Sequence, residues 1–157
     1  MQMGNLKLTS SAFSDGGEIP REYGYKNGNK VPPLTVSGSP EVPESLALIM
    51  DDPDAMGAVG KVWVHWVVWN IDPTDGPDYW EELQNLHPPL AVEGMTDFGE
   101  VGYGGPAPPD KRHTYVFKLY ALDTKLDLPD KSTKSDVEKA MEGHIIEQTQ
   151  LTGTYAP

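Results

Sequence analysis

Residues 46–70 read LALIMDDPDAMGAVGKVWVHWVVWN, which is two apolar runs joined by an acidic corner that contains a proline. The runs at 46–50 and 62–70 consist largely of β-prone side chains, so they predict two neighbouring strands of a buried sheet. The corner at residues 51–54 is the place in this stretch where polar chemistry can sit.

The second run has an ionisable side chain at its centre. Alternation predicts two apolar faces, one with Trp63, His65, Val67 and Trp69 and the other with Val62, Val64, Trp66 and Val68. Two apolar faces are typical of a central strand that is covered on both sides. Burying an imidazole without a hydrogen-bond partner is costly, so we expect Asp52 or Asp54 to be the partner of His65. The alternative is a structural core histidine beside a polar turn.

Length and composition predict one β-rich domain spanning residues 1–157. A chain of 157 residues suits a single domain with a sizeable core. Its 16 glycines and 15 prolines indicate many turns. The 24 acidic residues outnumber the 12 basic ones and give a net charge of -12, so neither nucleic acid nor an anionic membrane is expected as the main partner.

The absence of cysteine excludes a disulfide framework, a thiolate nucleophile and Cys-ligated metal. Residues 1–10 lack the pattern of a signal peptide, and no segment approaches the roughly 18 apolar residues that a membrane span needs. We therefore expect a cytoplasmic protein without membrane insertion.

Further elements are predicted along the chain. Alternating or β-prone residues predict strands at 6–10, 35–37, 112–122 and 151–155. A Ser-x-x-Glu capping pattern at Ser135–Glu138 and helical spacing of apolar residues predict a helix from Asp136 to about Gln148, with His144 packed on its apolar face. Residues 78–86 permit a short helix or a turn.

A second informative stretch, residues 97–109, reads DFGEVGYGGPAPP. Its four glycines and three prolines specify the shape of the backbone more than side-chain packing. Successive N–H groups in such a loop can form an anion-binding concavity, and the alternative is a plain tight connection. His113 and Tyr115 follow at the start of the next predicted strand, where they lie either at the rim of a pocket or at a strand end that meets solvent.

Taken together and in this order, four motifs resemble the phosphatidylethanolamine-binding protein family. They are Asp51–Ala55, Trp63–Ile71, the glycine- and proline-rich residues 97–109, and His113–Phe117. More narrowly, they are similar to its bacterial and archaeal branch, the YbhB/YbcL-type proteins related to Raf kinase inhibitor protein. Weaker similarity extends over nearly the whole chain.

The resemblance implies a mainly β fold: an antiparallel β-sandwich with one or two short helices, including a C-terminal helix. It also implies a small surface pocket for a phosphate-like anion, with no catalytic residue, metal or cofactor. Carried over motif by motif, the implied ligand-binding residues are Asp52, Asp54, Trp63, His65, Gly105, Pro106, His113 and Tyr115.

Three functions compete at this stage. The leading hypothesis is a non-enzymatic binding protein for a phosphate- or phosphoethanolamine-like anion that regulates a partner such as a kinase or serine protease. A second is a serine protease inhibitor that acts through surface loops such as Thr74–Pro89. The third is a metal-dependent hydrolase that uses the His/Asp pocket, although the chain has no His-Glu-x-x-His or Gly-x-Ser-x-Gly motif. The resemblance also leads us to expect a homodimer.

Overall fold

The computed structural model describes residues 6–37, 43–71, 80–82 and 91–157, with residues 80–82 described by their backbone. The helices and strands within these ranges are, in chain order, β1 (Lys7–Thr9), β2 (Gly17–Glu18), the 3-10 helix η1 (Arg21–Tyr23), β3 (Thr35–Ser37), β4 (Ser45–Asp52), α1 (Ala55–Val59), β5 (Trp63–Ile71), β6 (Trp80–Glu82), β7 (Val92–Glu93), β8 (His113–Leu122), α2 (Lys134–Met141) and β9 (Ile145–Tyr155).

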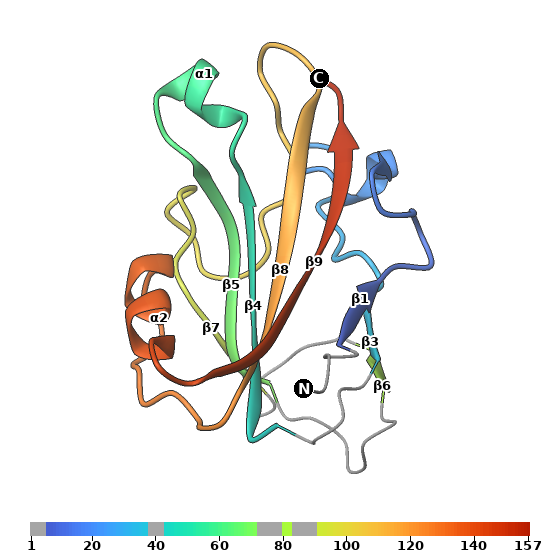
Figure 1. Cartoon of the computed structure of the whole chain (residues 1–157). Coiled ribbons are helices and arrows are strands. Elements are labelled where there is room, and N and C mark those ends of the chain that lie inside the picture. The colour runs from blue at the N-terminus through green and yellow to red at the C-terminus, as the bar shows by residue number, and fades with distance from the viewer. Residues whose placement is uncertain (1–5, 38–42, 72–79, 83–90) are drawn as a thin grey trace.

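The described strands form two sheets that face each other (Figure 1). The larger has six strands in the order β2-β9-β8-β4-β5-β7, and the smaller has three in the order β1-β3-β6. All neighbouring strands are antiparallel except β2 and β9, which run parallel. The predicted β-sandwich with few helices is confirmed.

Two layers of buried apolar side chains cover the two faces of the larger sheet. One layer fills the space between the sheets and includes Leu8, Val36, Leu46, Leu48, Met50, Trp66, Val68, Tyr115, Phe117 and Leu119. The other lies against α2 and includes Ala47, Ile49, Val67, Trp69, Leu122, Leu126, Val137 and Met141. The central strands are therefore covered on both sides, as their apolar runs predict.

The two strands predicted at residues 46–50 and 62–70 have the predicted arrangement. β4 and β5 are antiparallel neighbours, and all eight residues of β4 are buried. β8 pairs with the other edge of β4 and places alternate side chains in the core between the sheets. Figure 1 shows these three strands side by side at the centre of the molecule.

The pairing of β4 with β5 is irregular at His65. Met50 is opposite Trp66, whereas the next residue, Asp51, is opposite Val64. His65 is thus an extra residue in β5, which is the definition of a β-bulge.

This bulge overturns the predicted face of His65. Its ring contacts Tyr115 edge-on, with the ring centroids 5.2 Å apart, and Tyr115 belongs to the core between the sheets. Val67 and Trp69 pack in the other layer, against α2. His65 therefore shares the face of Trp66, because an extra residue breaks the period of two on which the prediction depends.

The predicted C-terminal helix begins near the expected residue but ends early. α2 closes at Met141 rather than Gln148. Its capping box joins Thr133 and Asp136, so it is not the predicted Ser135–Glu138 pair.

The chain leaves α2 through Gly143, whose φ of 79° is the left-handed conformation that often ends helices. β9 then begins at Ile145 and continues to Tyr155, so the predicted last strand is present but starts earlier. The predicted packing of His144 is wrong: its ring is exposed, and Nδ1 lies 2.8 Å from the Asp123 carboxylate.

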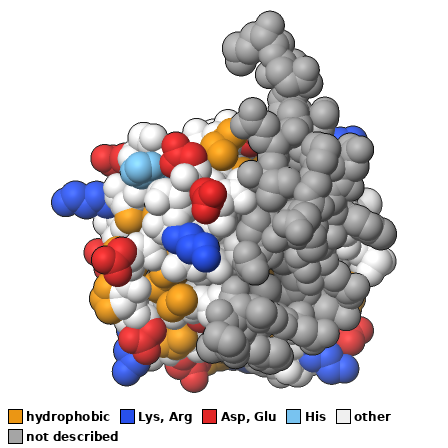
Figure 2. Space-filling model, turned by 90° about the horizontal axis from the view of Figure 1, so that it is seen from below, with side chains coloured by type: hydrophobic (Ala, Val, Ile, Leu, Met, Phe, Trp, Pro, Cys, Tyr) orange, Lys and Arg blue, Asp and Glu red, His pale blue; other side chains and the backbone are white. Residues whose placement is uncertain are grey.

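Of the segment predicted as a short helix or turn, Trp80–Glu82 is strand β6, and the rest of 78–86 lies outside the described residues. The protease-inhibitor hypothesis places its contacts in Thr74–Pro89, and this segment also lies outside the described residues except for β6. No helix in the described ranges is long and apolar enough to cross a membrane. At the end remote from α1, the described acidic and basic side chains are interspersed (Figure 2).

Candidate ligand-binding pocket

The central strands bring their polar ends together at one end of the larger sheet. β4 ends at Asp52, β8 begins at His113, and α1 connects β4 to β5 at the same end (Figure 1). A pocket of about 130 Å³ opens there. It is lined by Asp52, Ala55, Ala58, Val59, Trp63, His65, Phe98, Ala107, Pro109 and His113.

One wall carries a buried histidine between two carboxylates. Nδ1 of His113 lies 2.6 Å from Asp52 Oδ2, and Nε2 lies 2.7 Å from Asp110 Oδ1. Because ionised carboxylates only accept hydrogen bonds, both ring nitrogens donate and the imidazole is positively charged. Asp52 is itself fixed, since its other oxygen accepts the backbone N–H of Asp54 at 3.0 Å.

Charge and burial act in opposite directions on His113. Burial disfavours the imidazolium, but the hydrogen bonds and charges of Asp52 and Asp110 outweigh it and raise the pKa of His113 above its ordinary value. Desolvation alone would raise the pKa of Asp110, but the hydrogen bond and charge of His113, together with the backbone N–H groups of Lys111 and Asp110, lower it below its ordinary value.

His65 is a second buried imidazole with the opposite character. Its Nδ1 lies 2.7 Å from the carbonyl oxygen of Gly104, so Nδ1 donates and Nε2 carries the lone pair. Burial lowers the pKa of His65, although the Gly104 carbonyl and the Asp52 charge partly oppose this effect. Nε2 has no hydrogen-bond partner among the described residues, and His65 lines the pocket.

We therefore expect the two pocket histidines to titrate on opposite sides of pH 6.5, the ordinary value for histidine. His113 should lose its proton above that pH and His65 should gain one only below it. Long-range ¹H–¹⁵N spectra of the two imidazole rings, recorded across this range, measure both midpoints. A common midpoint for the two rings would contradict the geometry of the wall.

Aromatic side chains support His65 from two sides. The Phe98 ring stacks on Tyr25 and meets the rings of His65 and Trp63 edge-on. Tyr115 lies behind His65, is fully buried, and its hydroxyl has no hydrogen-bond partner among the described residues. Burial, with the nearby charge of Asp52, raises the pKa of Tyr115 well above its ordinary value. The tyrosine is therefore neutral.

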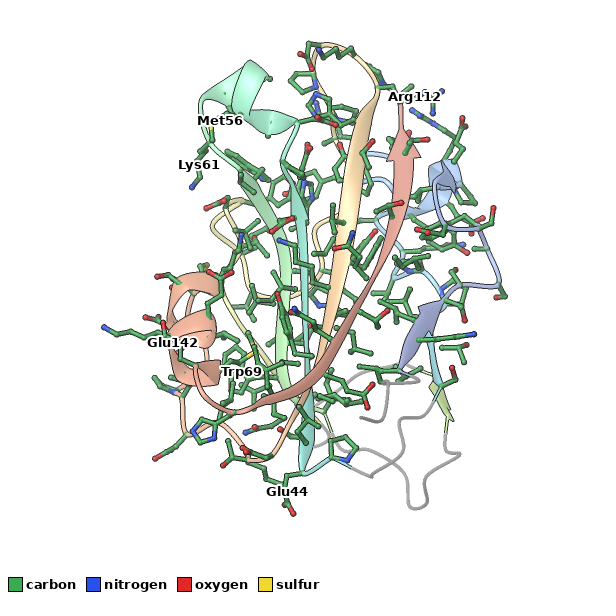
Figure 3. The ribbon with its side chains drawn as sticks, viewed as in Figure 1. Glu44, Met56, Lys61, Trp69, Arg112 and Glu142 are labelled. Atoms are coloured by element: carbon green, nitrogen blue, oxygen red, sulfur yellow. The ribbon has the colours of Figure 1, made fainter. Side chains whose placement is uncertain are left out.

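The opposite wall is apolar and comes from α1. Ala55, Ala58 and Val59 line the pocket on this side. Met56 and Val59 are exposed at 55% and 52%, and Figure 3 shows Met56 at this end of the molecule. The pocket thus has one polar wall and one apolar wall.

Of the eight residues expected at the site, the structure brings four to the pocket: Asp52, Trp63, His65 and His113. Tyr115 is close behind them. Asp54 instead accepts the backbone N–H of Thr114 at 2.8 Å, and so fixes the start of β8. The expected pairing of an aspartate with His65 is wrong, because Asp52 binds His113 and His65 binds a carbonyl.

The glycine-rich loop acts differently from the expected anion-binding concavity. The N–H of Gly104 donates to the carbonyl of His65 at 2.8 Å, and that of Gly105 donates to Asn29 Oδ1 at 2.7 Å. Pro106 accepts the N–H of Tyr25 at 2.9 Å and does not line the pocket. Gly105 and Pro106 therefore hold the loop in place, and the two glycine N–H groups are already used within the protein.

Sequence reasoning missed three contributors to the site: Asp110, Phe98 and the apolar side of α1. Asp110 precedes His113 by three residues in an exposed loop. An aspartate in such a loop carries no pattern by which it could be recognised. The Ala-Met-Gly-Ala-Val segment of α1 is small and apolar next to the acidic corner, and that composition is the one available signal for the second wall.

The motifs and this pocket agree with a family relationship that comparison establishes directly. Residues 9–156 match the family described as phosphatidylethanolamine-binding protein. The chain belongs to this family. A UPF0098 protein from Methanothermobacter thermautotrophicus is 45% identical over 152 residues, which cover 96% of this chain and 98% of that one. A UPF0098 protein from Chlamydia muridarum is 41% identical with the same coverage.

Solved structures of the phosphatidylethanolamine-binding protein family share the fold. A homologue of phosphatidylethanolamine-binding protein from Chlamydia trachomatis has a TM-score of 0.83 and 39% identity, over 96% of each chain. YbcL of Escherichia coli, described as a member of the mammalian family, has a TM-score of 0.82 and 32% identity, over 96% of this chain and 97% of that one. The predicted family, including its YbcL-like branch, is confirmed.

Proposed function

We propose that this member of the phosphatidylethanolamine-binding protein family is a non-enzymatic protein that binds a small phosphate-like anion in the pocket. The observation that carries the proposal is the pair of buried imidazoles on one wall. His113 is charged by its two carboxylates, and His65, whose Nδ1 donates to the Gly104 carbonyl, lines the pocket. Protonation of His65 would add a donor and a positive charge that point at the ligand.

The size of the pocket supports a head group rather than a large substrate. Its volume of about 130 Å³ is a few times the roughly 30 Å³ that one water occupies in the liquid. Pockets for drug-sized ligands run from about 300 to 1,000 Å³. A phosphate-sized group fits, and the apolar wall of α1 would contact whatever carbon skeleton continues from it.

The chemistry of the lining supports binding over catalysis. Among the described lining residues there is no serine, cysteine, threonine or lysine to act as a nucleophile. The groups able to move a proton are Asp52, His65 and His113, and two of these three are already tied to each other. Each His113 N–H that an acid catalyst could use already donates to a carboxylate.

The proposal predicts that anion affinity increases as the pH falls below 6.5. At pH 6.5 the unliganded His65 is neutral because burial lowers its pKa, and a bound anion favours its charged form. Affinity should rise by up to about tenfold per pH unit while one proton is taken up on binding. Calorimetric titrations with sulfate isolate this effect, because sulfate does not titrate in the range, and phosphate and phosphoethanolamine are compared with it.

Two variants make the test specific. His65→Asn keeps a polar side chain of similar width but cannot be charged, so its sulfate affinity should be weak and independent of pH. His144→Asn is the matched control, since His144 is exposed and lies beyond the other end of β8. Absence of saturable binding of all three anions to the wild type down to pH 5 would overturn the proposed function.

A further inference from the structure

We propose that Asp110 is a built-in competitor for the anion: its carboxylate occupies the His113 Nε2 position that a bound anion would take. Asp110 would then set the affinity of the pocket. This inference rests on the proposed function and adds a residue that determines its strength. The observation behind it is that Asp52 and Asp110, which both accept hydrogen bonds from the His113 ring, are not held equally firmly.

The two carboxylates differ in how firmly they are held. The side chain of Asp52 is 4% exposed, belongs to the end of a fully buried strand, and accepts a backbone N–H besides His113. The side chain of Asp110 is 42% exposed. Removing Asp52 from His113 would require unpacking β4, whereas Asp110 can move into solvent.

Asp110 lies in an exposed segment that is anchored at Arg112. Residues 109–112 are exposed and lie between the proline-rich loop and the first residue of β8. Arg112 is tied down by Glu18 at 3.0 Å and Thr154 at 3.2 Å, and Figure 3 shows it at the same end of the molecule as Met56. The Asp110 carboxylate accepts a hydrogen bond from His113, and the backbone N–H groups of Asp110 and Lys111 also favour its charged form.

A carboxylate and a phosphate or sulfate present the same kind of acceptor to an imidazolium. An anion oxygen at Nε2 would therefore preserve the hydrogen bond and the positive charge of His113 when Asp110 leaves. With Asp110 in place, one positive imidazole faces two negative carboxylates, so an approaching anion meets a net negative wall. Without Asp110, the ring and Asp52 balance each other.

Two substitutions of Asp110 separate the effect of its negative charge from the effect of its hydrogen bond to Nε2 of His113. Asp110→Asn keeps the size and an amide oxygen that can still accept from Nε2, and Asp110→Ala removes both charge and acceptor. Sulfate affinity at pH 6.5 is expected to rise by about tenfold in Asp110→Ala, since one close negative charge is removed, and by less in Asp110→Asn. Asp127→Asn changes the net charge equally beyond the far end of β8 and is expected to leave the affinity unchanged.

A spectroscopic readout accompanies the affinity. Without Asp110 the pKa of His113 should fall toward its ordinary value, and saturating sulfate should raise it again by replacing the lost carboxylate. Tighter sulfate binding in both variants than in the wild type, together with this recovery of the His113 pKa, supports the inference. Equal or weaker binding in Asp110→Ala than in a wild type that does bind would overturn the inference and leave the proposed function standing. No binding by any of the proteins would overturn both.

Discussion

Replacing Gly105 with alanine is expected to lower the free energy of unfolding by about 3 kcal/mol, because the added methyl group overlaps fixed backbone atoms. A Cβ at this position would collide with the carbonyl oxygen of Tyr23 and lie 2.9 Å from the backbone nitrogen of Tyr25. The loop at 104–106 would have to move away from this turn and would lose the hydrogen bonds that join them. Urea unfolding followed by tryptophan fluorescence measures the change.

Gly57 provides the matched control for this substitution. A Cβ there meets nothing within 4 Å, and the residue lies inside α1, where alanine is favoured over glycine. Gly57→Ala should therefore leave the protein as stable as before or slightly more so. If Gly105→Ala were equally harmless, the close packing of the loop against residues 23–25 would be wrong.

Replacing His113 with alanine is expected to cost about 3 to 5 kcal/mol of unfolding free energy, the usual penalty for breaking a buried ion pair from one side. The substitution leaves the Asp52 carboxylate, which is buried beside His113, without its 2.6 Å partner. It also removes a fully buried ring from the end of the sheet. Sulfate binding should be lost at the same time, since the charged side of the pocket is gone.

A double-mutant cycle identifies the origin of this loss. Asp52→Ala alone should also be destabilising, but the double variant should cost clearly less than the two single changes added together, because no unpaired charge remains buried. The pair of His144 and Asp123, which is exposed, gives the contrasting cycle with little or no coupling. Strict additivity at Asp52 and His113 would mean that the observed hydrogen bond contributes nothing to stability.

The sheet could be predicted because its signals are local. The apolar runs at 46–50 and 62–70 and the alternation at 112–122 each specify a strand with its neighbours, and the structure has β4, β5 and β8 there. The end of α2 could not be predicted in this way. Ile145 follows Met141 at helical spacing, so the pattern continues past Gly143, where a left-handed backbone ends the helix. Ile145 and Ile146 are both exposed at the start of β9, so the first residues of this strand show no alternation.

The candidate site could be predicted by residue type but not by pairing. Asp52, His65 and His113 were expected together, and the structure lines one pocket with them. Which carboxylate contacts which imidazole depends on the register of β4 with β5 and β8. The register at a bulge cannot be predicted from a local sequence pattern. Asp110 enters through a loop whose path is set by packing elsewhere. Its contact with His113 is therefore visible only in three dimensions.

Because of the bulge in β5, the pocket depends on the number of residues in this strand as well as on the identity of its side chains. Between Trp66 and Val64, β5 has one residue more than the facing strand, and that residue is His65. A chain lacking it would pair Val64 and Trp66 with consecutive residues of β4, restoring regular pairing at this position while losing the neutral imidazole. Regular pairing at this position and a two-histidine pocket are thus alternative outcomes separated by one residue. A substitution can only change the group at this position, whereas a one-residue deletion would remove the position itself.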